Sequence, residues 1–261
     1  MRALSISKLK ECLVNEDAAI STKDLIAVSD GAGGGGVFAD LWSKYLVKHL
    51  PEKPLTTYDG FDNWIDSIWE PFYIDCEEKA ISEGGMLLEK FYEEGSFATL
   101  VALWKNGQWL SYGDSVAFCY HPDTDLLEHS FGKLADFNDP PYLINCKDPL
   151  NEKGFCRGKF DVQKGDILFA ASDALSHYII MMYEITHQPQ FAGELDEAIK
   201  AQTKNSNFIL AAMSFKKKNY YRDVVRKLLN CWNTTNFSRH LQKLYDTGLM
   251  AHDDYTFVTF E

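Results

Sequence analysis

Hydrophobic and polar residues alternate at the start of the chain, a pattern that predicts a strand from about Ala3 to Leu13. A second, mostly apolar strand is predicted over residues 24–29, which read DLIAVS. The glycine-rich segment DGAGGGG follows. In VFADLWSKYLVKHL, apolar residues then recur at helical intervals up to Pro51, which cannot continue a helix. The predicted order is therefore strand, glycine turn and helix.

The middle of the chain changes from a helical to a strand-like pattern. Apolar residues recur every three or four positions over residues 62–93, which predicts two helices that Pro71 opens or interrupts. Three strand-like runs follow, FATLVALWK, GQWLSYGD and VAFCYH. Asn106-Gly107, between the first two, is the strongest short hairpin signal. These runs predict an antiparallel meander.

The remainder of the chain separates strands from helices. Residues 128–157 are rich in Asp, Asn, Pro and Gly, which predicts an irregular surface segment. GDILFAASDALS predicts a strand that ends in polar residues, residues 178–249 have helical periodicity, and residues 255–260 predict a closing strand. Because the strands and helices are bunched rather than alternating, we predict an α+β fold in which helices cover two antiparallel sheets. A single domain over residues 1–261 is expected.

Charge and composition narrow the class of protein. The 261-residue chain has a net charge of -12, which argues against nucleic-acid and anionic-membrane partners, since both require clustered basic residues. No apolar run approaches the roughly 20 residues that cross a bilayer, and the N-terminus lacks the pattern of an export signal. The six cysteines form no close pair that would clamp zinc. We expect a cytoplasmic protein with reduced cysteines in its core.

Four acidic residues share one sequence context. Glu16, Asp30, Asp173 and Asp253 each stand where a predicted strand meets a turn. Carboxylates on the ends of neighbouring strands converge and repel one another unless divalent cations neutralise them, and oxygen-only ligands favour magnesium or manganese. The alternative for each single residue is that it caps a helix.

The glycine run allows other interpretations. A phosphate-binding P-loop would end in Lys followed by Ser or Thr, and that ending is missing. The spacing of Gly31, Gly33 and Gly36 fits a dinucleotide fingerprint literally, but the alternating strands and helices of that fold are not predicted around it. The metal interpretation is therefore preferred.

Six short motifs occur in the order found in protein phosphatase 2C domains: NEDA, VSDGAGG, GSFATLVAL, YGDSVAF, GDILFAASDALS and DDYTFV. The chain resembles this family over almost its whole length, in particular a bacterial stand-alone catalytic domain. The resemblance implies a four-layer α-β-β-α sandwich and two bound Mn²⁺ or Mg²⁺ ions, with a third bound weakly. Such a pair of metals activates water for attack on a phosphomonoester.

The resemblance also implies roles for particular residues. Asp30 resembles the carboxylate that bridges both metals, and the Gly31 carbonyl resembles a ligand of one of them. Asp173 and Asp253 resemble ligands of the other metal. Glu16 resembles a carboxylate that contacts water on the metals.

Auxiliary positions are less regular. Asp114 resembles a ligand of the third metal, with a turn aspartate as the alternative. The family usually has a phosphate-binding arginine where this chain has Cys12, and we expect Lys10 to substitute for it if residues 8–13 form a strand.

Two later motifs also depart from the family. His177 replaces an aspartate of the ASDALSH motif and Ala174 replaces a glycine, so His177 is either a ligand or proton shuttle or a structural histidine. Asp254 replaces an asparagine, and either strengthens metal retention or points into solvent.

Three functions follow from these observations. The first is a serine/threonine phosphoprotein phosphatase that acts as a monomer on a phosphorylated protein, with a cognate serine/threonine kinase as partner. Loss of the arginine motivates the second, a pseudophosphatase that binds a phosphoprotein without turnover. The third is a hydrolase of a small phosphorylated metabolite.

Overall fold

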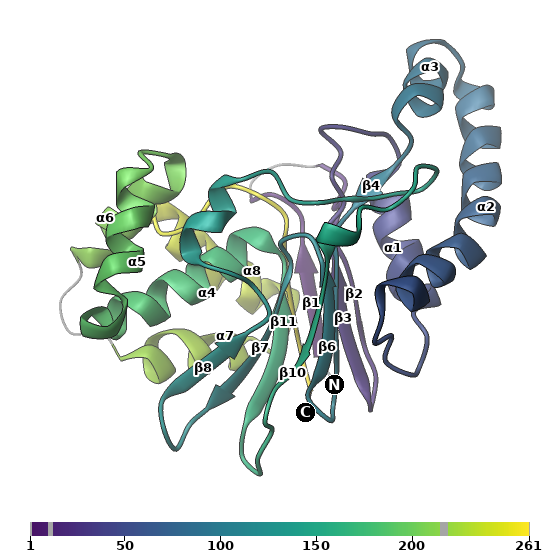
Figure 1. The fold of residues 1–261 in the computed structure, drawn as a ribbon. Coiled ribbons are helices and arrows are strands. Elements are labelled where there is room, and N and C mark those ends of the chain that lie inside the picture. Colours follow the sequence, from purple (N-terminus) through teal and green to yellow (C-terminus); the bar gives the residue numbers. More distant parts are fainter. Residues whose placement is uncertain (1, 10–12, 215–218, 261) are drawn as a thin grey trace.

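Two antiparallel sheets packed face to face form the centre of the computed structural model, which describes residues 2–9, 13–214 and 219–260 (Figure 1). The first sheet has the order β1-β12-β11-β7-β8, with the bounds Arg2–Ile6, Tyr255–Thr259, Ile167–Ala171, Val116–His121 and Leu126–His129. The second has the order β10-β6-β5-β3-β2, with the bounds Phe155–Lys159, Gln108–Tyr112, Leu100–Trp104, Leu25–Ser29 and Ala18–Ser21. A small separate sheet pairs β4 (Phe97–Ala98) with β9 (Ile144–Asn145).

Helices cover the outer face of each sheet (Figure 1). The second sheet packs against α1–α3, with the bounds Ala39–His49, Tyr58–Glu83 and Gly85–Glu94. The first sheet packs against α4–α8, with the bounds Asp173–Thr186, Gln188–Lys200, Lys204–Met213, Arg226–Leu229 and Thr234–Asp246. Short 3₁₀ turns lie at Leu134–Asn138 and Glu152–Gly154, and a π-helical turn lies at Tyr221–Val225. No helix within the described ranges is long and apolar enough to cross a membrane.

Three hydrophobic layers hold this arrangement together. One lies between α1–α3 and the second sheet, another between α4–α8 and the first sheet, and a third fills the space between the sheets. Strands β3, β5 and β7 have both faces covered, which is why their sequences read as nearly continuous apolar runs. The α+β prediction, a four-layer sandwich of two antiparallel sheets flanked by helices, is confirmed.

The N-terminal strand is shorter than predicted. β1 ends at Ile6, and residues 7–9 and 13–17 are not in a strand. The carboxylate of Asp254 accepts the backbone N–H groups of Lys8 (2.8 Å) and Glu16 (2.7 Å) and so draws this segment away from the sheet. The short strand β2, which the sequence interpretation missed, follows it.

The predicted three-strand meander is wrong in its last member. β5 and β6 form the expected hairpin around Asn106-Gly107. β7, however, pairs with β11 and β8 in the opposite sheet. Gly113, at φ 101, lies in the connection between β6 and β7 in a conformation that glycine adopts readily. Both strands are buried, so the hydrophobic pattern did not indicate which sheet each joins.

Two helices do cover residues 62–93, but Pro71 does not separate them. Pro71 lies on the exposed face of α2, where water can satisfy the carbonyl group left without a partner, while Phe72 and Ile68 pack on the opposite face. The break instead occurs at Gly84 and Gly85, both at positive φ. The predicted irregular segment over residues 128–157 is largely irregular, but its end forms β10 at a sheet edge.

Candidate functional site

Aspartates from both sheets converge at one end of the sandwich. Asp30 directly follows β3, Asp114 lies two residues before β7, Asp173 begins α4 after β11, and Asp253 lies two residues before β12. Burial raises the pKa of Asp30 well above its usual value, and the charges of Asp17, Asp173, Asp114 and Asp253 raise it further. The structure therefore brings these four predicted residues together.

The pKa values of Asp173 and Asp114 are also raised, that of Asp173 more strongly. Burial raises the pKa of Asp173 well above its usual value, with further increases from the charges of Asp114 and Asp253. Burial raises the pKa of Asp114 to about 6, and Asp253 adds to this. A cluster of carboxyls that mutually disfavour ionisation is a site that a divalent cation would stabilise.

Asp17 belongs to the same cluster, and sequence reasoning missed it. It is only 3% exposed and directly precedes β2. Burial raises its pKa to about 7, although hydroxyl groups of Thr256 and Ser172 lie near enough to lower it. Neither carboxylate oxygen has a well-aligned hydrogen bond among the described residues. The signal for Asp17 lies in the NEDA motif, which contains both Glu16 and Asp17. Because β2 was not predicted, only Glu16 was considered there.

Glu16 lies at the border of the cluster, beside Lys8 and the backbone of Gly33. Burial raises the pKa of Glu16, while the ammonium group of Lys8 lowers it. A Cβ atom on Gly33 would lie 2.0 Å from Oε1 of Glu16, and one on Gly31 would lie 2.7 Å from the carbonyl oxygens of Glu16 and Ala39. Gly31 is therefore required by close packing against backbone atoms, whereas at Gly33 only the end of the Glu16 side chain would have to move. Close packing thus accounts for one position of the glycine run without a phosphate-binding loop.

Hydrogen bonds between loops fix the position of Asp30. The backbone N–H of Thr99 donates to the Asp30 carbonyl (2.8 Å), and the Asp30 N–H faces Oγ1 of Thr99 at 3.3 Å. That Oγ1 atom also pairs with Oγ of Ser115 at 2.8 Å, next to Asp114. Because the partners are buried, these bonds hold the loop after β3 and the turn before β7 in a fixed relation.

Asp254 has a different role from either sequence interpretation. It is only 4% exposed and accepts backbone N–H groups of Lys8 and Glu16 with its two carboxylate oxygens. Its carboxylate therefore holds the N-terminal segment at the cluster, and it points neither into solvent nor freely towards a metal. An asparagine would present a donor NH₂ group to one of these two N–H groups, so it could not accept both bonds in this geometry.

His177 lies away from the cluster. It is 4% exposed, and its ring makes edge contacts with Phe137 (5.4 Å between centroids) and Phe208 (6.1 Å). Burial lowers its pKa to about 4, so the imidazole is neutral near pH 7. The structural interpretation of His177 fits this position, whereas a metal ligand or proton shuttle does not.

A lysine does lie at the carboxylates, at position 8. Its Nζ atom is 3.5 Å from Oδ1 of Asp253, and the Lys8 side chain is 31% exposed. Burial lowers the pKa of Lys8, but Asp253, Asp254 and Glu16 outweigh this effect and raise the pKa above its usual value. Lys10 and Cys12, the residues considered from the sequence, lie outside the described residues.

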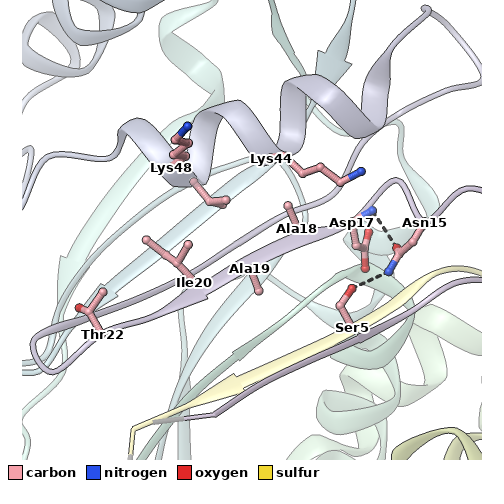
Figure 2. A pocket seen from close by; sticks show the side chains of 10 residues that line it. Ser5, Asn15, Asp17, Ala18, Ala19, Ile20, Thr22, Lys44 and Lys48 are labelled. Carbon is pink, nitrogen blue, oxygen red and sulfur yellow. Dashed lines mark hydrogen bonds between the residues drawn. The ribbon is translucent and has the colours of Figure 1, made fainter.

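A groove of about 650 Å³ borders the cluster. Figure 2 shows it between the edge strand β2 and helix α1, with Asp17 and Asn15 at one end and Thr22 at the other. Lys44 and Lys48 extend over it from α1. Lys44 pairs with Asp40 (2.9 Å), whereas Lys48, towards the Thr22 end of the groove, makes no ion pair within the described ranges.

Comparisons with known proteins agree with the fold. No protein-family model and no curated protein matches the chain. The solved structure of the Mycobacterium tuberculosis serine/threonine phosphatase PstP/Ppp matches with a TM-score of 0.53 and 15% identity, over 99% of this chain and 97% of that one. The catalytic domain of PstP in complex with two manganese ions matches with a TM-score of 0.50 and 15% identity, over 99% and 96%. The chain therefore has the fold of these serine/threonine phosphatases, as its resemblance to protein phosphatase 2C domains implied.

Proposed function

We propose that the protein is a metal-dependent serine/threonine phosphoprotein phosphatase. The convergence of Asp30, Asp114, Asp173 and Asp17 at one end of the sandwich is the observation that carries this proposal. The shared fold and the phosphatase-like order of the motifs support it. The proposal includes a monomeric enzyme and a kinase whose phosphorylation it reverses.

The donor atoms of the cluster suit hard divalent cations such as Mn²⁺ or Mg²⁺. Carboxylate and carbonyl oxygens are the ligands that these ions prefer, and Asp17 has two buried oxygens without a well-aligned partner. Asp30, the Gly31 carbonyl, Asp173 and Asp253 would hold two ions. A third, more weakly held ion would use Asp114. When bound, the pair would lower the pKa of a bridging water and neutralise phosphoryl oxygens.

Residues of the N-terminal segment complete this site. Glu16 lies beside the cluster, where its carboxylate would accept a hydrogen bond from water and orient it. Lys8 presents an ammonium group next to Asp253, where it would bind the phosphate of the substrate. Asp254 would position both residues through their backbone N–H groups. The phosphate-binding role is thus proposed for Lys8, while the expectation for Lys10, which lies outside the described residues, stays a prediction.

The groove of Figure 2 supports a protein substrate over a small metabolite. It leads along β2 to Asp17, and β2 is at the edge of its sheet, so an extended peptide has room beside it. Lys48, which makes no ion pair within the described residues, would attract an acidic residue of the peptide further along the groove.

Metal-dependent hydrolysis tests the proposal. The purified chain should hydrolyse p-nitrophenyl phosphate and a phosphothreonine peptide with Mn²⁺, and Asp30→Ala should abolish both activities. Asp123→Asn, an exposed carboxylate in the turn after β7, is the matched control and should retain both. Absence of hydrolysis above the Asp30→Ala level would reject the enzyme. Peptide binding without hydrolysis would instead identify a phosphoprotein-binding module.

A separate kinetic experiment tests whether Lys8 binds the phosphate of the substrate. Lys8→Gln should raise KM for the phosphopeptide at least about tenfold, because a hydrogen bond to a charged group contributes about 1.5–3 kcal/mol. Lys23→Gln, an exposed lysine before β3, should leave KM unchanged. If Lys10→Ala raised KM and Lys8→Gln did not, the role would belong to Lys10.

A further inference from the structure

A second group of potential metal ligands lies at the far end of the β7–β11 strand pair. Asp114 and Asp173 flank these strands at the carboxylate cluster, whereas His121 ends β7 and Asp166 directly precedes β11 at the other end. The six residues of β7 span roughly 16 Å at about 3.3 Å per residue. The two groups therefore share two strands but are well separated.

The strand register places four side chains on one face at this far end. Cys119 and His121 are two residues apart on β7 and so point to the same side of the sheet. Glu128 of β8 is the pairing partner of Cys119, and Asp166 continues the β11 register opposite His121. Cys119 packs in the layer between the two sheets, so the four side chains lie on the inner face of the first sheet, with that of Glu128 still 37% exposed.

The distances are those of a compact ligand set. Nδ1 of His121 is 2.9 Å from Oδ2 of Asp166, and its Nε2 is 2.8 Å from Oε1 of Glu128. Ligand atoms of Cys119, His121 and Asp166 all lie within 4.8 Å of one another. The backbone N–H of Gln163 donates to Oδ2 of Asp166 (2.6 Å) and fixes that carboxylate. The thiol is fully buried, and the side chains of His121 and Asp166 are 13% and 7% exposed.

We propose that Cys119, His121 and Asp166 form a zinc-type metal site separate from the carboxylate cluster. A thiolate, an imidazole and a carboxylate are the ligand types of tetrahedral zinc, and three protein ligands leave the fourth position for water. Glu128 would accept the Nε2–H of His121, the usual partner of a metal-bound histidine. Mg²⁺ and Mn²⁺ would prefer the oxygen-only cluster at the other end.

Binding at this site requires a change of protonation. Burial raises the pKa of the Cys119 thiol to about 12, and the charges of Asp166, Glu128 and Asp161 raise it further. Zinc would therefore displace the thiol proton as the sulfur–zinc bond forms, and the proton would pass to solvent. His121 would bind through the lone pair of Nδ1 and keep its proton on Nε2. The metal would then link β7 to β11, with β8 held through Glu128.

Cobalt(II) is the sensitive probe, because a thiolate ligand gives a charge-transfer absorption that oxygen ligands do not. The chelator-treated full chain should develop this absorption on titration with Co²⁺, and Zn²⁺ should displace it. Cys119→Ser should remove the band, and Asp166→Asn should weaken Zn²⁺ binding at least about tenfold. The second variant keeps the buried thiol if the first does not fold.

Two variants control for other sites. Cys76→Ser removes another buried thiol whose pKa burial raises to about 12, and it should keep the band. Asp30→Asn, at the carboxylate cluster, should also keep it. No thiolate band in the wild type, or the same band in Cys119→Ser, would overturn the proposal and leave His121 as an imidazole paired with two carboxylates. Zn²⁺ should also raise the melting temperature of Asp30→Asn but not that of the double variant Asp30→Asn/Cys119→Ser.

Discussion

The two ends of the β7–β11 strand pair carry different donor atoms, although the same strands position both. One end gathers carboxylates from segments as distant as Asp17 and Asp253. The other combines a thiol, an imidazole and a carboxylate within residues 119–166. Backbone register decides which residues meet at each end, whereas side-chain chemistry decides which cation each end prefers. One sandwich can therefore hold a hard-cation site and a zinc-type site at opposite ends of the same two strands, each with a different preferred ion.

Asp30→Asn should have the largest effect, because it changes the carboxylate end and leaves the zinc-type end unchanged. Hydrolysis with Mn²⁺ should fall at least about 100-fold, since even a partner of a metal ligand contributes about 10–100-fold. The metal-free variant should be more stable than the metal-free wild type, because burial and neighbouring charges raise the pKa of Asp30 and so disfavour its ionised form. Steady-state kinetics and thermal denaturation in chelator measure both effects. Unchanged kinetics would remove Asp30 from the site.

The pH dependence of stability tests the carboxylate end. Burial raises the pKa of Asp17 to about 7 and that of Asp114 to about 6, from about 3.9 in the unfolded chain. Between about pH 4 and pH 7 the folded chain holds protons that the unfolded chain releases. These two groups should therefore contribute a loss of a few kcal/mol of stability as the pH rises through this window, whereas His177, whose pKa burial lowers to about 4, contributes in the opposite direction. Urea denaturation of the wild type and of Asp17→Asn in chelator isolates the carboxylate contribution, which should be smaller in the variant, and Mn²⁺ should reduce it.

Glu128→Gln tests the other end in the same way. Its neutral side chain can still accept the Nε2–H of His121 but no longer supports it with charge, so Zn²⁺ affinity should fall about tenfold. Hydrolysis with Mn²⁺ should not change, because Glu128 lies at the opposite end of β7 from Asp114. Competition with a chromophoric chelator gives the affinity. A parallel loss of hydrolysis would show that the two ends are coupled.

Asp254→Asn should have the smallest effect. The variant keeps one acceptor for the N–H groups of Lys8 and Glu16, and the loss of the other should reduce stability by about 1 kcal/mol. KM should rise more than kcat falls, because Lys8 is less firmly placed beside Asp253. Denaturation curves and phosphopeptide kinetics test this, and the Zn²⁺ affinity of the far end serves as an internal control.

Much of the fold could be predicted from local patterns. The strand over residues 25–29, the Asn106-Gly107 hairpin and the helix that ends before Pro51 are confirmed. The prediction that Pro71 opens or interrupts a helix was wrong, because the effect of a proline within a helix depends on which face of that helix meets solvent, and Pro71 lies on the exposed face of α2. The prediction that β7 continues the meander of β5 and β6 was wrong, because a strand buried on both faces has the same hydrophobic pattern in either sheet. These errors concern tertiary neighbours, which the local sequence does not encode.

The candidate site likewise contains residues that the sequence predicted and residues whose role depends on tertiary neighbours. Asp30, Asp173 and Asp253 were predicted as one group with Glu16, and Asp114 as an auxiliary ligand; the structure brings the four aspartates together. Their proposed roles as metal ligands remain predictions. Asp17 was missed because its burial depends on β2. The role of Asp254 was missed because its partners lie 246 and 238 residues away in the sequence.

By itself the sequence determined the class of fold and the kind of atoms available to the site, because hydrophobic periodicity and residue type are local properties. Only the tertiary structure decided which carboxylates meet, which lysine lies beside them, and that Cys119 and His121 face Asp166. Those decisions depend on strand register across two sheets, where a shift of one residue would turn every side chain to the opposite face.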